Sequence, residues 1–186
     1  MSDQRVHGVG AVAAARKPRP PLYTPEERVR RDNTYWTFLQ GILAPIQFLV
    51  FLGSLGFVLR YLWTGEGLQI ANHSVVAKTL MLYTIMITGC IWEKVVFGRY
   101  LFAPAFFWED VFSMLVLALH TTYLFAMYTG RLSGAELMYL ALAAYATYVV
   151  NAGQFILKLR AARLDYEARS REQTAPSGVV MGRAVA

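Results

Sequence analysis

The chain of 186 residues has little cysteine and little charge. Its single cysteine, Cys90, excludes an internal disulfide framework and leaves too few ligands for a cysteine-based zinc site. Charged residues make up only 16% of the chain, hydrophobic residues make up 56%, and the hydrophobic residues form long runs. Such a composition indicates a membrane protein and not a soluble domain.

The sequence also lacks a recognisable cleavable signal peptide and any nucleic-acid-binding motif. The first 35 residues hold seven basic residues and no apolar run before Trp36. The formal charge of +6 comes from Lys and Arg near the two ends of the chain, and anionic lipid headgroups explain it more simply than DNA or RNA. We therefore expect a lipid bilayer, and no nucleic acid, among the partners.

Four apolar runs are long enough to cross a bilayer, which takes about 20 helical residues. We expect the spanning helices near residues 38–62, 76–98, 110–129 and 135–158. The two outer links, TGEGLQIANHS and TGRLSG, are short, and short links favour antiparallel neighbours in one bundle. The predicted fold is an all-α integral membrane protein, a four-transmembrane-helix bundle.

The segments outside these spans are assigned from composition and capping signals. Thr24 followed by Pro25 and two glutamates predicts the start of a short interfacial helix over residues 24–36. Residues 22–164 form the predicted membrane domain. The N-terminal tail, 1–21, and the C-terminal tail, 165–186, are rich in Ala, Gly, Pro and charge, so we expect both to be mobile.

The distribution of basic residues predicts the orientation in the membrane. Fifteen of the 18 Lys and Arg residues lie in the N-terminal segment, the connection 94–109 or the segment from Lys158 onward. The other side is left with Arg60, Lys78 and Arg131. The positive-inside rule therefore places both termini and the middle connection in the cytoplasm.

Polar side chains inside hydrocarbon are costly, so each needs a structural or functional reason. On the predicted topology most of them lie in the cytoplasmic half, and His120 lies about 15 Å deep. Helical spacing places three sets on one face each: Tyr83, Met86, Cys90, Glu93 and Phe97; Asp110, Ser113, Leu117 and His120; and Tyr145, Tyr148 and Asn151. We expect these faces to enclose a pocket that opens at the cytoplasmic surface beside FAPAFFWED, an aromatic and acidic stretch.

Several of these residues have a structural alternative. Glu109 and Asp110 begin a predicted helix, where the helix dipole favours acidic residues, so a structural role is favoured for that pair. For Glu93, a chemical role and an interhelical ion pair with a residue such as Lys158 both stay open. His120 is a candidate for a metal, a proton or simple packing. One intramembrane histidine excludes a bis-histidine haem bundle.

Four stretches carry a resemblance to a known family: LYTPEERVRRDNTYWTFLQGILAPIQFLVFLGSLG, IWEKVVFGRYLFAPAFFWEDVFSML, ALHTTY and YVVNAGQFILKLRAARL. They closely resemble the 2-vinyl (3-vinyl) bacteriochlorophyllide hydratases of bacteriochlorophyll synthesis, over about residues 22–164. The resemblance implies a hydro-lyase that adds water to the ring-A vinyl group of a chlorophyllide or bacteriochlorophyllide, giving a 1-hydroxyethyl group. It also implies a multi-pass protein of the bacterial inner (cytoplasmic or intracytoplasmic) membrane, with other enzymes of this synthesis as candidate partners.

No residue role is carried over from the family, so the roles expected here come from chemistry and position. Acid-catalysed hydration needs a proton donor, a water site and a flat slot. Glu93 is the expected acid, with Asp110 or Glu109 relaying protons or orienting water. His120 is expected to bind the substrate magnesium as an axial ligand, to act as a base toward water, or only to pack. The expected substrate-binding residues are Tyr83, Arg99, Phe106, Trp108, Tyr145, Tyr148, Asn151 and Gln154.

The substrate accounts for the remaining expectations. Its magnesium arrives inside the chlorin and hydration is redox neutral, so no separate cofactor is expected. Its propionate is expected near Arg99, Lys94 or the basic N-terminal helix. The alternative is a non-catalytic chlorophyllide carrier or an assembly protein of photosynthetic complexes with the same pocket.

Overall fold

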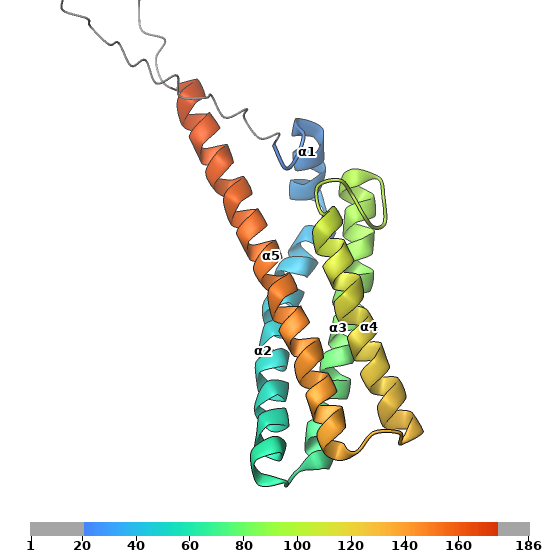
Figure 1. Ribbon diagram of the computed structural model, residues 1–186. Coiled ribbons are helices and arrows are strands. Elements are labelled where there is room, and N and C mark those ends of the chain that lie inside the picture. Colours follow the sequence, from blue (N-terminus) through green and yellow to red (C-terminus); the bar gives the residue numbers. More distant parts are fainter. Residues whose placement is uncertain (1–20, 175–186) are drawn as a thin grey trace, which may run out of the picture.

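The computed structural model describes residues 21–174, which form five helices and no strand. The helices are α1 (Pro25–Asn33), α2 (Tyr35–Thr64), α3 (Leu68–Phe97), α4 (Phe107–Thr129) and α5 (Gly134–Thr174). Figure 1 shows α1 and the α3–α4 connection at one end of the bundle, called here the α1 end. The short α2–α3 and α4–α5 links lie at the other, called the opposite end. The predicted tail up to residue 20, and residues 175–186, lie outside the described residues.

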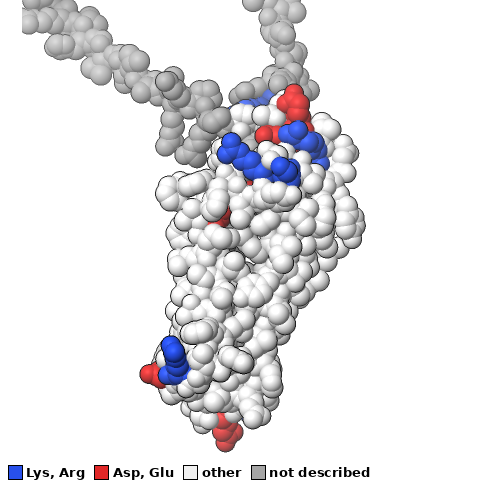
Figure 2. Space-filling view, turned by 90° about the vertical axis from the view of Figure 1, so that its right-hand side faces the viewer, with Lys and Arg blue, Asp and Glu red and all other residues white. Residues whose placement is uncertain are grey.

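The four long helices have the length and the composition of membrane-spanning helices. Each of α2 to α5 is long and apolar enough to cross a membrane. On the face seen in Figure 2, Lys and Arg gather mainly at the α1 end, and a broad band without charged side chains separates the two ends. The prediction of an all-α protein with four membrane-spanning helices is confirmed.

The helix start predicted at Thr24 is present in the structure. The Thr24 side chain accepts a hydrogen bond from the Glu27 N–H, and the Glu27 carboxylate accepts one from the Thr24 N–H, which is a capping box. α1 ends at Asn33, earlier than the predicted residue 36, because Thr34 leaves the helical conformation and caps α2 instead.

The helix that carries the second predicted span, near residues 76–98, begins earlier than that span. α3 begins at Leu68, and the link from α2 is reduced to residues 65–67, with Gly67 in the left-handed conformation at φ 85°. The first turns of α3 belong to the core because Ala71 and Val75 are fully buried. The polar residues between them made this stretch resemble a loop in the sequence.

The last helix is longer than predicted. α5 continues past residue 158 to Thr174, so residues 165–174 of the predicted C-terminal tail are helical. Ion pairing supports this extension: the Arg163 Nε donates to the Glu167 carboxylate over 3.0 Å, one turn apart. In Figure 1 this part of α5 extends beyond the other spanning helices at the α1 end.

Lys78 does not lie where the orientation argument placed it. It was assigned to the side of the membrane opposite the termini, but it lies ten residues into α3 and its side chain is fully buried. Its amine lies 3.7 Å from the centroid of the Tyr148 ring. One lysine does not interrupt an apolar run, so hydropathy could not separate a flanking cation from a buried one.

Buried side chains form two clusters that determine where open space remains. The larger one joins α2 to α5 through residues such as Val58, Val75, Val116 and Met138, and it fills the bundle toward the opposite end. The smaller one is aromatic and lies at the α1 end. The pocket described next lies between these two clusters.

Candidate functional site

A pocket of about 670 Å³ opens between the spanning helices toward the α1 end. Its wall is mainly apolar, and all five helices contribute to it. The polar and charged residues that line it are Tyr23, Arg31, Thr37, Gln40, Gln47, Glu93, Asp110, Ser113, Tyr148 and Asn151. An apolar cavity of this size with few polar groups is typical of a small-molecule site.

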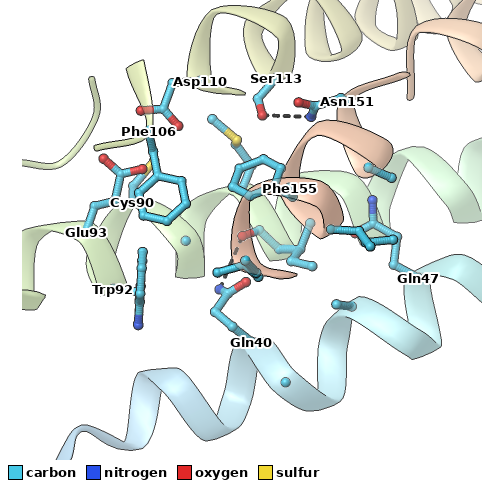
Figure 3. Close-up of a pocket in the computed structure, with 18 of the residues that line it drawn as sticks. Gln40, Gln47, Cys90, Trp92, Glu93, Phe106, Asp110, Ser113, Asn151 and Phe155 are labelled. Carbon is cyan, nitrogen blue, oxygen red and sulfur yellow. Dashed lines mark hydrogen bonds between the residues drawn. The ribbon is translucent and has the colours of Figure 1, made fainter. Parts of the chain in front are cut away.

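Two carboxyl groups, Glu93 from α3 and Asp110 from α4, meet in this wall and are called here the acid pair. Both are buried, with 5% and 3% of their surface exposed. The Phe102 N–H donates to the Asp110 Oδ2 over 2.7 Å, and the Ala103 N–H lies 3.4 Å from the Glu93 Oε2. Figure 3 shows the two carboxyl groups as neighbours on the same side of the pocket.

The connection between α3 and α4 positions the acid pair. Gly98 ends α3 in the left-handed conformation, at φ 78°, and its N–H bonds to the Lys94 carbonyl. Phe102 also has a positive φ, 58°, which is uncommon for a residue with a Cβ. This backbone directs two consecutive amides at the carboxyl groups. Strained backbone of this kind is concentrated at functional sites.

Glu109 and Asp110 are adjacent in the sequence but have different surroundings. The Lys158 Nζ lies 2.5 Å from the Glu109 Oε2, so this ion pair joins α5 to α4. Glu109 does not line the pocket, whereas Asp110 does. The ion pair considered for Glu93 is therefore made by Glu109, and Glu93 has the Asp110 carboxyl as its neighbour instead.

Aromatic rings form the pocket wall beside the acid pair. Phe106 is almost completely buried, and its ring centroid lies 5.7 Å from those of Trp92 and Phe155. All three rings line the pocket. Of the four aromatic residues in FAPAFFWED, only Phe106 is buried. Trp108 is 66% exposed, and Phe102 and Phe107 are exposed as well.

Amide side chains provide hydrogen-bond acceptors in the same pocket. The Asn151 Nδ2 donates to the Ser113 Oγ over 2.9 Å, so the Asn151 Oδ1 is left as an acceptor (Figure 3). The Asn151 Oδ1 and the Gln47 Oε1 are both buried and have no protein hydrogen-bond partner among residues 21–174. Each can accept a hydrogen bond from a hydroxyl group or a water molecule in the pocket.

Arg31 of α1 is the only Lys or Arg that lines the pocket in the described part of the chain. Its guanidinium lies 4.7 Å from the centroid of the Tyr23 ring and pairs with Asp32 over 2.6 Å. Burial raises the pKa of the Tyr23 phenol, in spite of the nearby Arg31, so this hydroxyl keeps its proton and can donate a hydrogen bond. Arg31 and Tyr23 can therefore bind a carboxylate.

The structure brings only part of the predicted site together. Glu93, Asp110, Phe106, Tyr148 and Asn151 line the pocket. The other predicted residues, Glu109, His120, Tyr83, Arg99, Trp108, Tyr145 and Gln154, do not.

These other residues have identifiable surroundings. Arg99 is exposed. Lys94, which was expected near the propionate, donates a hydrogen bond from its amine to the Gly98 carbonyl. The Tyr83 hydroxyl lies 2.9 Å from the Thr121 hydroxyl. His120 and Tyr145 are buried deeper in the bundle, where their ring centroids are 5.8 Å apart. The Gln154 Oε1 is buried and has no partner in the described chain.

Sequence reasoning missed Arg31, Trp92 and Phe155 as individual pocket residues. Phe155 could have been found, because it follows Asn151 by four residues and so continues the face of Tyr148 and Asn151. No sequence signal separated Arg31 from the other basic residues of its helix.

Four membrane-spanning helices around an acid-lined apolar pocket define a multi-pass membrane protein with a small-molecule site. The family model described as 2-vinyl bacteriochlorophyllide hydratase matches residues 23–161, and the chain belongs to this family. The resemblance inferred from the sequence is thereby confirmed.

Two similar proteins bear the same description, 2-vinyl bacteriochlorophyllide hydratase. The one from Cereibacter sphaeroides is 68% identical over 151 residues, which cover 81% of this chain and 94% of that protein. The one from Rhodobacter capsulatus is 66% identical over 146 residues, covering 78% of this chain and 85% of that protein. No solved structure matches the chain.

Proposed function

We propose that this chain hydrates the ring-A vinyl group of a bacteriochlorophyllide to a 1-hydroxyethyl group, using the acid pair as its proton donor and acceptor. Membership of the hydratase family makes it a hydro-lyase of bacteriochlorophyll synthesis. The observation that carries the mechanism is the meeting of Glu93 and Asp110 in an apolar pocket.

The first step is protonation of the terminal vinyl carbon. Glu93, in its carboxylic acid form, gives its proton to that carbon, and the two π electrons form the new C–H bond. The positive charge is left on the carbon next to the macrocycle, which delocalises it. The mainly apolar wall limits the access of bulk water to this cation.

The second step is capture of the cation by water. The water oxygen bonds to the carbon next to the ring, and one of its protons goes to a carboxylate of the acid pair. Asp110 is placed to orient this water, because the Phe102 N–H fixes its carboxyl group. The reaction consumes one water, and the acid pair regains the proton that it gave, so no redox cofactor is required. The magnesium is part of the chlorin substrate.

The rest of the pocket suits a flat pigment with one anionic group. The Trp92, Phe106 and Phe155 rings provide apolar surface for the macrocycle. Arg31, with Tyr23, takes the propionate at the α1 end, in place of the exposed Arg99 expected from the sequence. The Asn151 and Gln47 acceptor oxygens can hold water or the product hydroxyl.

The orientation in the membrane follows the same proposal. The α1 end faces the cytoplasm of a bacterial inner or intracytoplasmic membrane, with α1 at the interface, since most Lys and Arg residues lie near that end. Other enzymes of bacteriochlorophyll synthesis are the expected partners at this surface.

The test is hydration by purified protein in lipid nanodiscs supplied with vinyl bacteriochlorophyllide. Mass spectrometry should detect a pigment heavier by one water. Glu93→Gln should lower turnover by about 100-fold or more, because general acid catalysis contributes a factor of this order, and Asp110→Asn by about 10-fold or more. Glu66→Gln, an exposed carboxylate at the opposite end, is the matched control and should match the wild type.

Pigment binding is measured on the same samples by absorption. Bound but chemically unchanged pigment in the wild type would favour the carrier. Normal turnover in Glu93→Gln, with normal protein level, would remove Glu93 from the mechanism without affecting the assignment of the activity.

A further inference from the structure

A second group of polar side chains lies deeper in the bundle than the pocket. Lys78 of α3 and His120 of α4 are both fully buried. The Lys78 Nζ and the His120 Nε2 have no protein hydrogen-bond partner within residues 21–174, and neither residue lines the pocket. Buried polar atoms of native proteins are nearly always satisfied, so these two nitrogens need a partner that residues 21–174 do not provide.

The two nitrogens are complementary. The His120 Nδ1 lies 2.8 Å from the Val116 carbonyl oxygen, which can only accept, so Nδ1 carries the hydrogen. In the neutral ring the Nε2 is then an acceptor. The Lys78 amine can only donate, and the Tyr148 ring face occupies part of its surroundings. The two groups are close enough to interact electrostatically but form no direct hydrogen bond.

A water molecule has the donor and the acceptor that these two nitrogens lack. Placed between them, it would accept a hydrogen bond from the Lys78 amine and donate one to the His120 Nε2. An anion satisfies only the lysine, because it has no hydrogen to donate to the imidazole.

Tyr148 connects this place to the pocket. It lines the pocket, and the Lys78 amine lies 3.7 Å from its ring centroid. Lys78 itself does not reach the pocket. Tyr148 is therefore next to both the pocket and the Lys78 amine.

Hydroxyl groups connect the same place to the opposite end of the bundle. The Ser74 and Ser54 hydroxyls are 2.8 Å apart, and Ser54 also bonds to the Tyr145 hydroxyl. Ser74 lies within two turns of the start of α3, and the Tyr145 ring packs on His120. These contacts form a row of polar groups between Ser74 and the His120 ring in an otherwise apolar core.

We infer that Lys78 and His120 hold a buried water and that this site supplies the water substrate to the pigment pocket from the opposite end. The inference rests on the proposed hydration. A pigment in the pocket closes the α1 end, yet each turnover consumes one water. The route has to deliver water and no net proton, since hydration returns the proton that it borrows.

The water is tested directly by radiolytic hydroxyl-radical labelling of the pigment-free protein in nanodiscs. Radicals formed from a bound water oxidise the side chains next to it, so Tyr145, which does not line the pocket, should be labelled although it is buried. Lys78→Met and His120→Phe should each reduce this labelling several-fold. Thr79→Val is the matched control, because it removes a buried hydroxyl in the same turn that bonds only within α3, to Val75.

Turnover is measured on the same variants with pigment as the varied substrate. Lys78→Met and His120→Phe should lower kcat by about 10-fold with little change in the KM for pigment, because each loses one hydrogen bond to the water. His120→Gln keeps an acceptor and should recover part of the rate. Circular dichroism selects folded samples, and either variant alone suffices if the other does not fold.

Two results would overturn the inference. Unchanged labelling in folded Lys78→Met and His120→Phe would show that these residues hold no water. Lost labelling with unchanged kcat would show that the water held there is not the substrate supply. If the wild type does not hydrate pigment at all, the proposed function fails, while the labelling still decides whether the water is bound.

Discussion

Phe102 donates its backbone N–H to the Asp110 carboxylate over 2.7 Å from a left-handed conformation, φ 58°. One residue thus combines an unfavourable backbone angle with a hydrogen bond to the acid pair. The Phe102 side chain does not line the pocket, so we expect its hydrogen bond, and not its phenyl ring, to matter for the site.

A pair of substitutions at Phe102 tests this relationship. Phe102→Gly keeps the N–H and favours the positive φ, so turnover should stay within about twofold of wild type. Phe102→Pro removes the N–H and fixes φ near −65°, so turnover should fall by about 10-fold or more. Both are measured by pigment hydration on folded protein. Equal rates in the two variants would contradict a role for this amide.

Glu109 and Lys158 should matter for stability more than for chemistry. Their ion pair joins α4 to α5 and is largely screened from water. Lys158→Met or Glu109→Gln alone leaves a group without its charged partner and should destabilise the protein by about 1–3 kcal/mol. The double variant should lose less than the sum of the two, as thermal unfolding in detergent can measure. Turnover per folded molecule should change little, whereas a loss like that of Glu93→Gln would assign Glu109 to the chemistry.

Arg31 should determine how tightly the pigment carboxylate is held. Arg31→Ala should raise the KM for bacteriochlorophyllide by about 10-fold, because a charge-assisted hydrogen bond to the propionate is lost, and leave kcat nearly unchanged. With the methyl ester of the same pigment, wild type and Arg31→Ala should behave alike. Arg99→Ala serves as comparison, since Arg99 is exposed outside the pocket. A larger effect at Arg99 than at Arg31 would restore the expectation drawn from the sequence.

Filling the pocket should prevent pigment binding without harming the fold. Gly89 lines the pocket, and a Cβ added there would meet only the Gln40 amide at 3.8 Å. Gly89→Leu should therefore be folded but should lose pigment absorption after gel filtration. Gly56→Leu is the matched control, because a Cβ there meets nothing within 4 Å and the residue does not line the pocket. Equal pigment binding in both variants would place the pigment elsewhere.

The sequence was sufficient for the spans and for part of the site. Apolar runs located all four membrane-spanning helices, and helical spacing placed Glu93 and Asp110 on faces that do meet. It could not identify the amides that hold them, because the positive φ of Phe102 is imposed by the folded connection. Charge counting likewise assigned Lys78 to the membrane side opposite the termini, although its side chain is buried. The sequence around a single lysine in an apolar run does not indicate whether the side chain is buried.

The sequence also could not identify the carboxylate that pairs with Lys158. Lys158 was considered for Glu93 but bonds to Glu109, and the choice depends on the rotation of α5 against α4. Glu109 and Asp110 point about 100° apart around α4, so the rotation of α4 decides which of them faces Lys158 and which faces Glu93. That rotation is determined by side-chain packing, which periodicity does not describe.

Both members of the acid pair and both amides that hold it come from one helical hairpin, residues 93–110. The surfaces facing it, from α2 and α5, contribute shape and acceptor groups instead. In the proposed mechanism the proton-transfer groups are therefore encoded in one stretch of the chain, and much of the substrate-binding surface is encoded in others. Directed evolution for other vinyl-bearing pigments could randomise the pocket residues of α2 and α5 and leave the hairpin unaltered.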